Sequence, residues 1–251
     1  MATKKRLKSS LHRARSEESK GQVLPFKGRA LPFFIVFVAI VGFFNALRFG
    51  SASLDYYSVR DAVDDWELNA SIPTEAEFEQ TKGAINTANV LHYSNPLYID
   101  LSGQLDEWGA ISGFEETVGL KQAQANYIEA TKIRPLWPVT WANLVMVKWR
   151  LQEFDEEMLD YLSRANKLGP QSVEVHILFV RMGLSLFAAN HPMYAYIKDT
   201  VRERLRRGLR NPYSRDKIVS FINSTKSMST ACAWMLQEED ETAIKQLACS
   251  R

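Results

Sequence analysis

The sequence has few of the residues that build catalytic or metal sites. Its 251 residues include two cysteines and four histidines, and no histidine has a second His, Cys or carboxylate at metal-ligand spacing on one helix face. Glycine and proline are also scarce, and there is no Gly-rich phosphate loop, no G-x-S-x-G motif and no H-E-x-x-H motif. These absences predict a protein without a metal, a cofactor or enzymatic activity.

Charged residues are missing from one long segment near the N-terminus. The eighteen residues 30–47 carry no charge. As a helix they would reach about 27 Å, close to the hydrocarbon thickness of a bilayer. Pro32 stands near the start, where a missing amide proton costs a helix little. We therefore predict a transmembrane helix over residues 30–48.

The charges on the two sides of this segment differ in sign. Residues 1–29 hold nine Lys or Arg against two Glu, whereas residues 49–72 are acidic. Since basic flanks stay in the cytoplasm, this asymmetry predicts a cytoplasmic tail over 1–29 and an acidic juxtamembrane linker or helix over 49–72 on the far side of the membrane. Three alternatives stay open: a cleaved signal peptide cut near residues 51–53, a buried core helix, and a mitochondrial inner-membrane anchor.

The chain after the basic tail has a mildly acidic balance. Of 31 Lys and Arg and 29 Asp and Glu, the tail takes nine and two, which leaves 22 and 27 and a net charge of −5. This balance predicts no nucleic-acid partner. In an oxidising compartment, Cys232 and Cys249 are candidates for a disulfide between terminal helices, with two reduced thiols as the alternative.

Residues 73–251 show a helical pattern that repeats. Three segments share the order small or medium, large, small, proline at offsets of 4, 3 and 5: Ala84-x3-Ala88-x2-Leu91-x4-Pro96, Ala123-x3-Tyr127-x2-Ala130-x4-Pro135 and Met158-x3-Leu162-x2-Ala165-x4-Pro170. Small residues let such a helix approach its partner closely, and proline ends it. The pattern predicts an all-α fold: a transmembrane helix followed by a degenerate tetratricopeptide-like α-solenoid over 73–251, with first helices near 98–108, 141–151 and 173–187. Further helices are predicted near 193–208 and 214–224, with two short ones after them. An irregular helical bundle is the alternative.

Aromatic side chains gather in the first two predicted units. Trp108, Trp137, Trp141 and Tyr127 are candidate binding residues, because rings on the concave face of an array stack on sugars or peptide side chains. The alternative is packing between helices. That alternative is favoured for Trp141, while Trp137 follows Pro135 in a predicted loop.

Basic residues gather in the predicted helix near 193–208. Arg202 and Arg206 share a face at i,i+4, and Arg210 continues it if the helix extends that far. Such a patch is a candidate site for phosphate, an acidic glycan or an acidic partner surface. The alternative is a solvated helix face with internal ion pairs. His176, on an apolar helix, is expected as a hydrogen-bonded interior residue.

Two acidic runs are candidate sources of catalytic carboxylates. Asp106-Glu107 and Asp155-Glu156-Glu157 are predicted as turn and first-turn charges that cap helices. A glycan-modifying enzyme would need two carboxylates at a fixed separation, and the sequence does not point to such a pair.

Residues 134–157 (RPLWPVTWANLVMVKWRLQEFDEE) and 165–176 (ANKLGPQSVEVH), with the anchor and the acidic linker, resemble the VpsP-type polysaccharide biosynthesis proteins. The likeness covers most of residues 30–185. It implies an inner-membrane protein with a periplasmic helical domain that serves exopolysaccharide or biofilm-matrix production. Its implied partners are membrane-bound synthesis or export components, with an acidic glycan as a further candidate. No catalytic residue is carried over.

Overall fold

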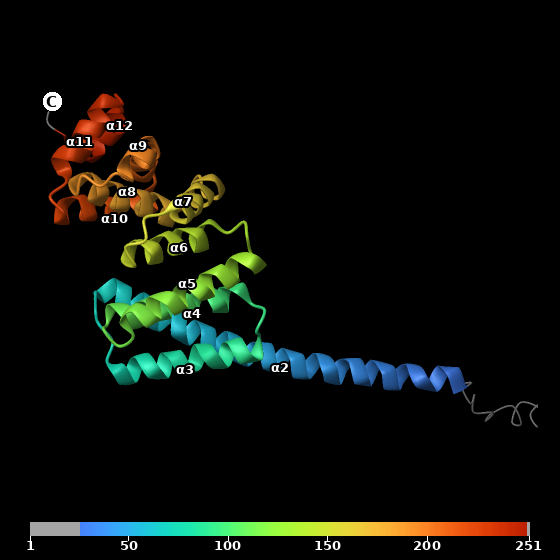
Figure 1. Ribbon diagram of the computed structural model, residues 1–251. Helices are drawn as coiled ribbons and strands as arrows, with labels where there is room; N and C mark the ends of the chain where they lie inside the picture. Colours follow the sequence, from blue (N-terminus) through green and yellow to red (C-terminus); the bar gives the residue numbers. More distant parts are fainter. Residues whose placement is uncertain (1–25, 250–251) are drawn as a thin grey trace, which may run out of the picture. The chain divides into compact units, whose positions relative to one another are not determined.

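A computed structural model describes residues 26–249 of the chain, with side chains from residue 31. These residues form eleven helices and no strand (Figure 1). The all-α prediction is confirmed. The helices are α2 (Phe26–Asn69), α3 (Glu75–Leu91), α4 (Pro96–Ile111), α5 (Glu116–Ile133), α6 (Pro138–Arg150), α7 (Glu156–Leu168), α8 (Val173–Ala188), α9 (Tyr194–Arg210), α10 (Pro212–Ser224), α11 (Met228–Gln237) and α12 (Glu241–Gln246).

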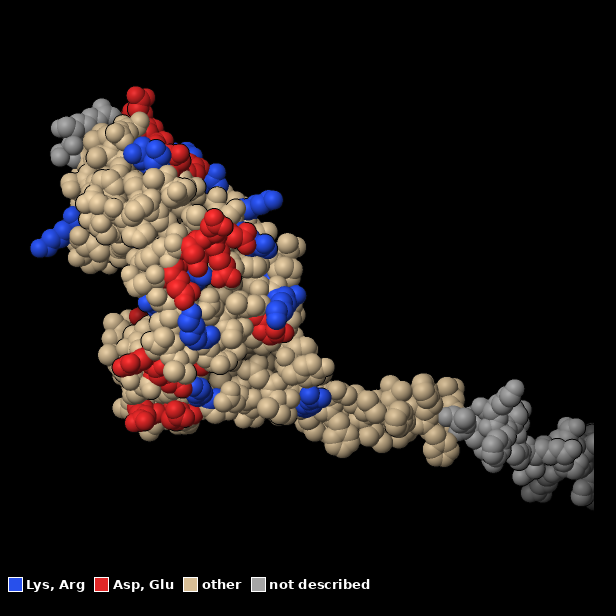
Figure 2. Space-filling view, viewed as in Figure 1, with Lys and Arg blue, Asp and Glu red and all other residues tan. Residues whose placement is uncertain are grey.

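The chain divides into two units, the first ending at Gly50 and the second beginning at Ser51. In the first unit α2 exposes all residues from Leu31 to Gly50, and Figure 2 shows a long surface without charge over most of this stretch. Among the described residues α2 is the one helix long and apolar enough to cross a membrane, properties that a signal sequence shares. The Nδ2 of Asn45 donates to the carbonyl of Val41 at 2.8 Å, which pairs a polar group within its own helix.

One detail of this region differs from the predictions. α2 begins at Phe26, so Pro32 lies inside the helix and not in its first turn. α2 continues without a break to Asn69, so the apolar segment and the acidic juxtamembrane segment form one helix, which the division into two units crosses after Gly50. The rest of the basic tail, residues 1–25, lies outside the described residues.

The helices of the second unit stack in chain order as an array (Figure 1). α4 packs on α5, α6 on α7 and α8 on α9, and neighbouring pairs meet through α5 with α6, α6 with α8, and α8 with α10. Each sequence repeat has one completely buried alanine, although not at the same position of the pattern: Ala88, Ala123 and Ala165. Their missing bulk lets the helices approach closely, as the pattern predicted.

Local signals define where the helices begin. Thr74 caps α3 with a capping box, in which its hydroxyl accepts from the amide of Glu77 and the Glu77 carboxylate accepts from the Thr74 amide. Pro73 lies one residue before the N-cap Thr74 and is outside α3. Asp155 caps α7 by accepting from the amide of Met158 at 2.9 Å, so the acidic run at 155–157 has the predicted place.

The buried apolar side chains of the second unit form two clusters that meet at α4 and α5. One contains Val59 and Trp66 of α2 with side chains of α3 and α4, and the other extends from α5 to the C-terminal helices. α4 and α5 come very close at Gly103, where a Cβ atom would lie 2.6 Å from Cε1 of Tyr127. Between the two clusters lies a layer of buried polar groups.

Candidate functional site: a polar groove over helix α4

Three buried carboxyl groups on α4 make up the centre of this polar layer: Asp100, Asp106 and Glu107. Asp100 accepts from Thr140 Oγ1 at 2.6 Å. Glu107 accepts from the Tyr127 hydroxyl at 2.6 Å and pairs with Arg150. These contacts tie α4 to α5 and α6. The prediction that residues 106 and 107 are turn charges was wrong, because both lie inside α4 and find partners on other helices.

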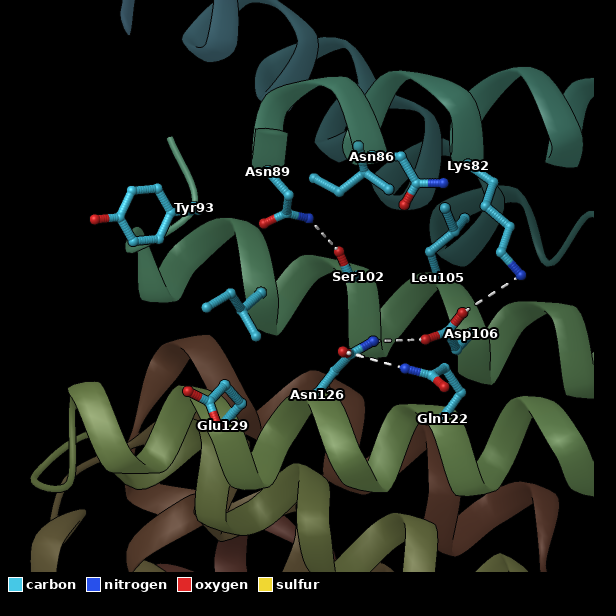
Figure 3. A pocket seen from close by; sticks show the side chains of 12 residues that line it. Lys82, Asn86, Asn89, Tyr93, Ser102, Leu105, Asp106, Gln122, Asn126 and Glu129 are labelled. Atoms are coloured by element: carbon cyan, nitrogen blue, oxygen red, sulfur yellow. Dashed lines mark hydrogen bonds and ion pairs between the residues drawn. The ribbon is translucent and has the colours of Figure 1, made fainter. Parts of the chain in front are cut away.

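Asp106 differs from the other two carboxyls because it faces an open groove. α3 and α5 wall this groove and α4 floors it, with a volume of about 550 Å³ (Figure 3). Most of its lining is polar, with amide side chains on both walls. The lining residues are Lys82, Ile85, Asn86, Asn89, Tyr93, Ile99, Ser102, Leu105, Asp106, Gln122, Asn126 and Glu129.

Charged groups meet at one end of the groove. Asp106 accepts from Asn126 Nδ2 at 2.8 Å, and its other oxygen lies 3.7 Å from Lys82 Nζ (Figure 3). Lys82 also pairs with Glu115, so one ammonium serves two carboxylates. Burial raises the pKa of Asp106 to about 6, against the opposing effect of Lys82 and with a further increase from Glu115. A carboxyl with this pKa carries a proton for part of the time near neutral pH.

Asn89 gives the middle of the groove an unsatisfied acceptor. Its Nδ2 donates to Ser102 Oγ at 2.8 Å, and that hydroxyl donates to the carbonyl of Tyr98 (Figure 3). The Oδ1 of Asn89 is buried and has no hydrogen-bond partner. An unpaired buried acceptor is costly, and a ligand donor could compensate it only if the Asn89 side chain turned this oxygen toward the groove.

The four predicted aromatic residues lie apart from this groove. Trp108 packs edge-on against Trp66, with 5.8 Å between ring centroids. Tyr127 is completely buried, and Trp141 is buried with its Nε1 donating to the carbonyl of Pro135 at 2.8 Å. Trp137 is 43% exposed and lies under the guanidinium of Arg134. The structure thus gives three of them packing contacts and places one at the surface.

The predicted basic patch is largely paired within the protein. Arg210 Nη2 lies 2.6 Å from Asp240, Arg206 lies 2.5 Å from Glu203, and Arg202 lies 3.7 Å from Glu238. Asp240 also caps α12 by accepting from the amide of Ala243. The pairs of Arg202 and Arg210 connect α9 to the C-terminal segment, whereas the pair of Arg206 with Glu203 lies within α9, as the alternative of a helix face with internal ion pairs predicts.

Arg204 of the same helix has a structural position. It is buried and donates to the carbonyls of Asn166 and Gly169, the last acceptors of α7, at 2.6 and 2.7 Å. His176 is fully buried, with Nδ1 3.4 Å from an Arg204 nitrogen. Burial, and then the charges of Arg204 and Arg207, lower the pKa of His176 to about 4, so its ring is neutral. An interior role for His176 agrees with this environment.

The two cysteines are joined by a disulfide between Cys232 and Cys249, whose Cα atoms lie 5.6 Å apart. The bond closes α11 and α12 into one terminal hairpin. Both cysteines lie against the larger apolar cluster.

Sequence reasoning missed the groove itself. Lys82, Asn86, Asn89, Gln122 and Asn126 had no place among the predicted site residues. The one available signal was spacing, since the amides fall at i,i+3 in α3 and at i,i+4 in α5 and so share a helix face. No His, Cys, Asp and Glu cluster of metal-binding kind occurs among the described residues.

Comparison with known proteins adds no relative. Neither a protein-family model nor a curated protein matches this chain. The likeness to VpsP-type proteins therefore stays a prediction, and the groove is the feature from which function can be inferred.

Proposed function

We propose that this chain is a non-enzymatic accessory or scaffold protein of exopolysaccharide biosynthesis or export. The first part of α2 would anchor it in a bacterial inner membrane, and the helical array would bind a partner protein or glycan in the periplasm. The observation that carries the proposal is an open polar groove in a helical-repeat domain that follows a single membrane-spanning candidate. The resemblance of residues 134–157 and 165–176 supplies the link to polysaccharide.

Two features support a periplasmic location for the array. Nine basic residues precede the apolar segment and acidic residues follow it, the distribution that keeps the N-terminus in the cytoplasm. The disulfide between Cys232 and Cys249 also suits an oxidising compartment.

Reporter fusions test this topology directly. A phosphatase that is active only in the periplasm, fused after residue 60, should be active, whereas the same fusion after residue 20 should be silent. Cytoplasmic activity of a reporter at residue 60 would overturn the topology and the partners that depend on it.

Crosslinking in intact cells tests the proposed partner. A photoreactive residue at Asn86, exposed on the groove wall, should capture a membrane-bound polysaccharide synthesis or export component or the polymer itself. The same residue at Tyr213, exposed on α10, is the matched control and should not. If Asn86 captured only envelope proteins unrelated to polysaccharide, a general envelope-assembly scaffold would be the better description.

A glycan-modifying enzyme is the second candidate, and one observation favours it. Asp106 faces the groove with a pKa of about 6, and Glu115 shares Lys82 with it. On that alternative the purified full-length chain would change the length or substitution of the polymer, and Asp106→Asn would stop the change. On our proposal the wild-type chain leaves the polymer unaltered.

A further inference from the structure

We infer that the groove between α3, α4 and α5 binds a segment of an uncharged, hydroxyl-rich glycan through its side-chain amides. The inference rests on the proposed function, because it names the ligand class of the same site. It also moves glycan binding away from Arg202, Arg206 and Arg210.

The many polar side chains of the groove favour a ligand with polar groups over a purely apolar one. Three of its lining residues are apolar, and two of these, Ile85 and Leu105, are each only 1% exposed. A ligand in the groove would therefore contact polar groups and aliphatic carbon in roughly equal measure, with the polar groups supplied by amide, hydroxyl, carboxyl and ammonium side chains. Sites for apolar small molecules and for amphipathic helices are lined mainly by apolar side chains.

The same lining does not suit a protein hot spot. Such positions are enriched in Trp, Tyr and Arg that insert into dry pockets. The groove has neither Trp nor Arg, and its one Tyr, Tyr93, stands at its end with 76% of its surface exposed. An extended peptide would also need apolar pockets for alternate side chains, which these residues do not provide.

The charges of the groove exclude a strongly acidic ligand. Its single cation, Lys82, is already engaged by Asp106 and Glu115. Glu129, at the other end, pairs with Lys132 at 2.8 Å. A phosphate or a uronic acid would find no free cation among the groove residues and would face two carboxylates. An uncharged ligand avoids that repulsion.

Amide side chains match vicinal hydroxyl groups. A carboxamide presents donors and an acceptor side by side, and each sugar hydroxyl can both donate and accept. Asn86 of α3 and Gln122 of α5 are exposed on opposite walls, and Asn126 is oriented by its bond to Asp106 (Figure 3). Asn89, also on α3, has an Oδ1 without a hydrogen-bond partner, but this oxygen is buried and would have to turn toward the groove to meet a ligand. The Tyr93 ring at the end of the groove offers a face on which a sugar ring can stack.

The test uses the full-length chain in detergent micelles on a printed glycan array with neutral, amino and uronic acid oligosaccharides. Ligand-detected NMR on the best neutral oligosaccharide would measure its affinity. We expect binding to neutral glycans that falls about tenfold in the double variant Asn86→Leu/Gln122→Leu, which loses two hydrogen-bonding side chains. Both residues are exposed, so the variant should keep the wild-type melting temperature. Trp137→Ala and Arg206→Gln are the matched controls and should bind as wild type does.

Each other outcome overturns the inference. Binding restricted to acidic glycans, binding lost in Arg206→Gln instead, preference for a phage-displayed random peptide library, or no glycan binding would each do so. Crosslinking to a polysaccharide component without glycan binding would reject this inference and keep the proposed function. Glycan binding without such crosslinks would keep this inference and reject the proposed role in polysaccharide synthesis or export.

Discussion

Replacing Asp106 with Asn should stabilise the protein at neutral pH and leave its stability at acidic pH almost unchanged. Asp106 is buried on α4, and burial raises its pKa from an ordinary value of 3.8 to about 6. The native state therefore holds the proton more tightly than the unfolded chain does. The stability that comes from this proton is fully present below about pH 4 and is lost as the pH rises through about 6.

The expected size follows from the shift. A difference of about two pKa units corresponds to roughly 3 kcal/mol of unfolding free energy, which is an upper bound for the gain from removing the charge at pH 7.5. Asn would keep an acceptor for Asn126 but would lose the attraction to Lys82. Since Lys82 still has Glu115, that loss is only partial. We expect a net gain of about 1–3 kcal/mol at pH 7.5 and about zero at pH 4.

The measurement is urea unfolding of the full-length chain in detergent, followed by tryptophan fluorescence at pH 4, 6 and 7.5. Only the difference between variant and wild type is interpreted, because other carboxyls titrate in both proteins. Asp160→Asn is the matched control, since Asp160 forms an exposed pair with Arg164 and should change stability by less than about 1 kcal/mol. A difference for Asp106→Asn that is constant with pH, or a loss that grows toward pH 7.5, would refute the reasoning.

Three further variants test the packing of the array, each by the same urea unfolding. Gly103→Ala should cost about 1–3 kcal/mol, because its Cβ would lie 2.6 Å from the Tyr127 ring at the closest approach of α4 and α5. Arg204→Met should cost about 3 kcal/mol, because it removes charge-assisted hydrogen bonds to the last carbonyls of α7. Replacing Cys232 and Cys249 by Ala should cost about 3 kcal/mol, because the disulfide closes a separation of 17 residues, and should expose the C-terminal hairpin to limited proteolysis.

Matched controls separate these effects from general sensitivity. Gly83→Ala places a methyl group in open space on α3 and should be neutral or stabilising by up to about 1 kcal/mol. Arg207→Met removes a half-exposed guanidinium paired with Glu203 and should cost less than about 1 kcal/mol. Equal losses of stability from both glycine variants would contradict the close approach at Gly103. Equal losses from both arginine variants would contradict the capping role of Arg204.

The helices could be predicted because their signals are local. The apolar stretch near the N-terminus, the 3.6-residue periodicity and the small residues at Ala88, Ala123 and Ala165 depend only on neighbours in sequence. The polar segment after the apolar stretch continues α2 with helical periodicity and buries Val59 and Trp66. The start of this helix was predicted less well, because α2 begins at Phe26 and places Pro32 inside the helix.

The groove could not be predicted because its partners come from different helices. A charge inside a periodic segment usually marks an exposed face, which led to the expectation of turn charges at Asp106 and Glu107. Both are buried because Lys82, Asn126, Tyr127 and Arg150 satisfy them from elements distant in sequence. The clusters most visible in the sequence, aromatic and basic, meet mainly internal partners.

The groove also combines two costs that packing alone does not require. Burial of Asp106 favours the protonated form of its carboxyl, and Asn89 has an unpaired acceptor. Both residues line the same groove, Asp106 from α4 and Asn89 from α3. Asp100 and Glu107 also have close hydrogen-bond donors, and burial raises the pKa of Asp100 too, but neither of these carboxyls lines the groove. Proteins place such strained polar groups where a ligand compensates them, and stability is then traded for binding. On this reasoning a variant stabilised at Asp106 should bind the groove's ligand more weakly, whereas one destabilised at Arg204 and still folded should bind it unchanged.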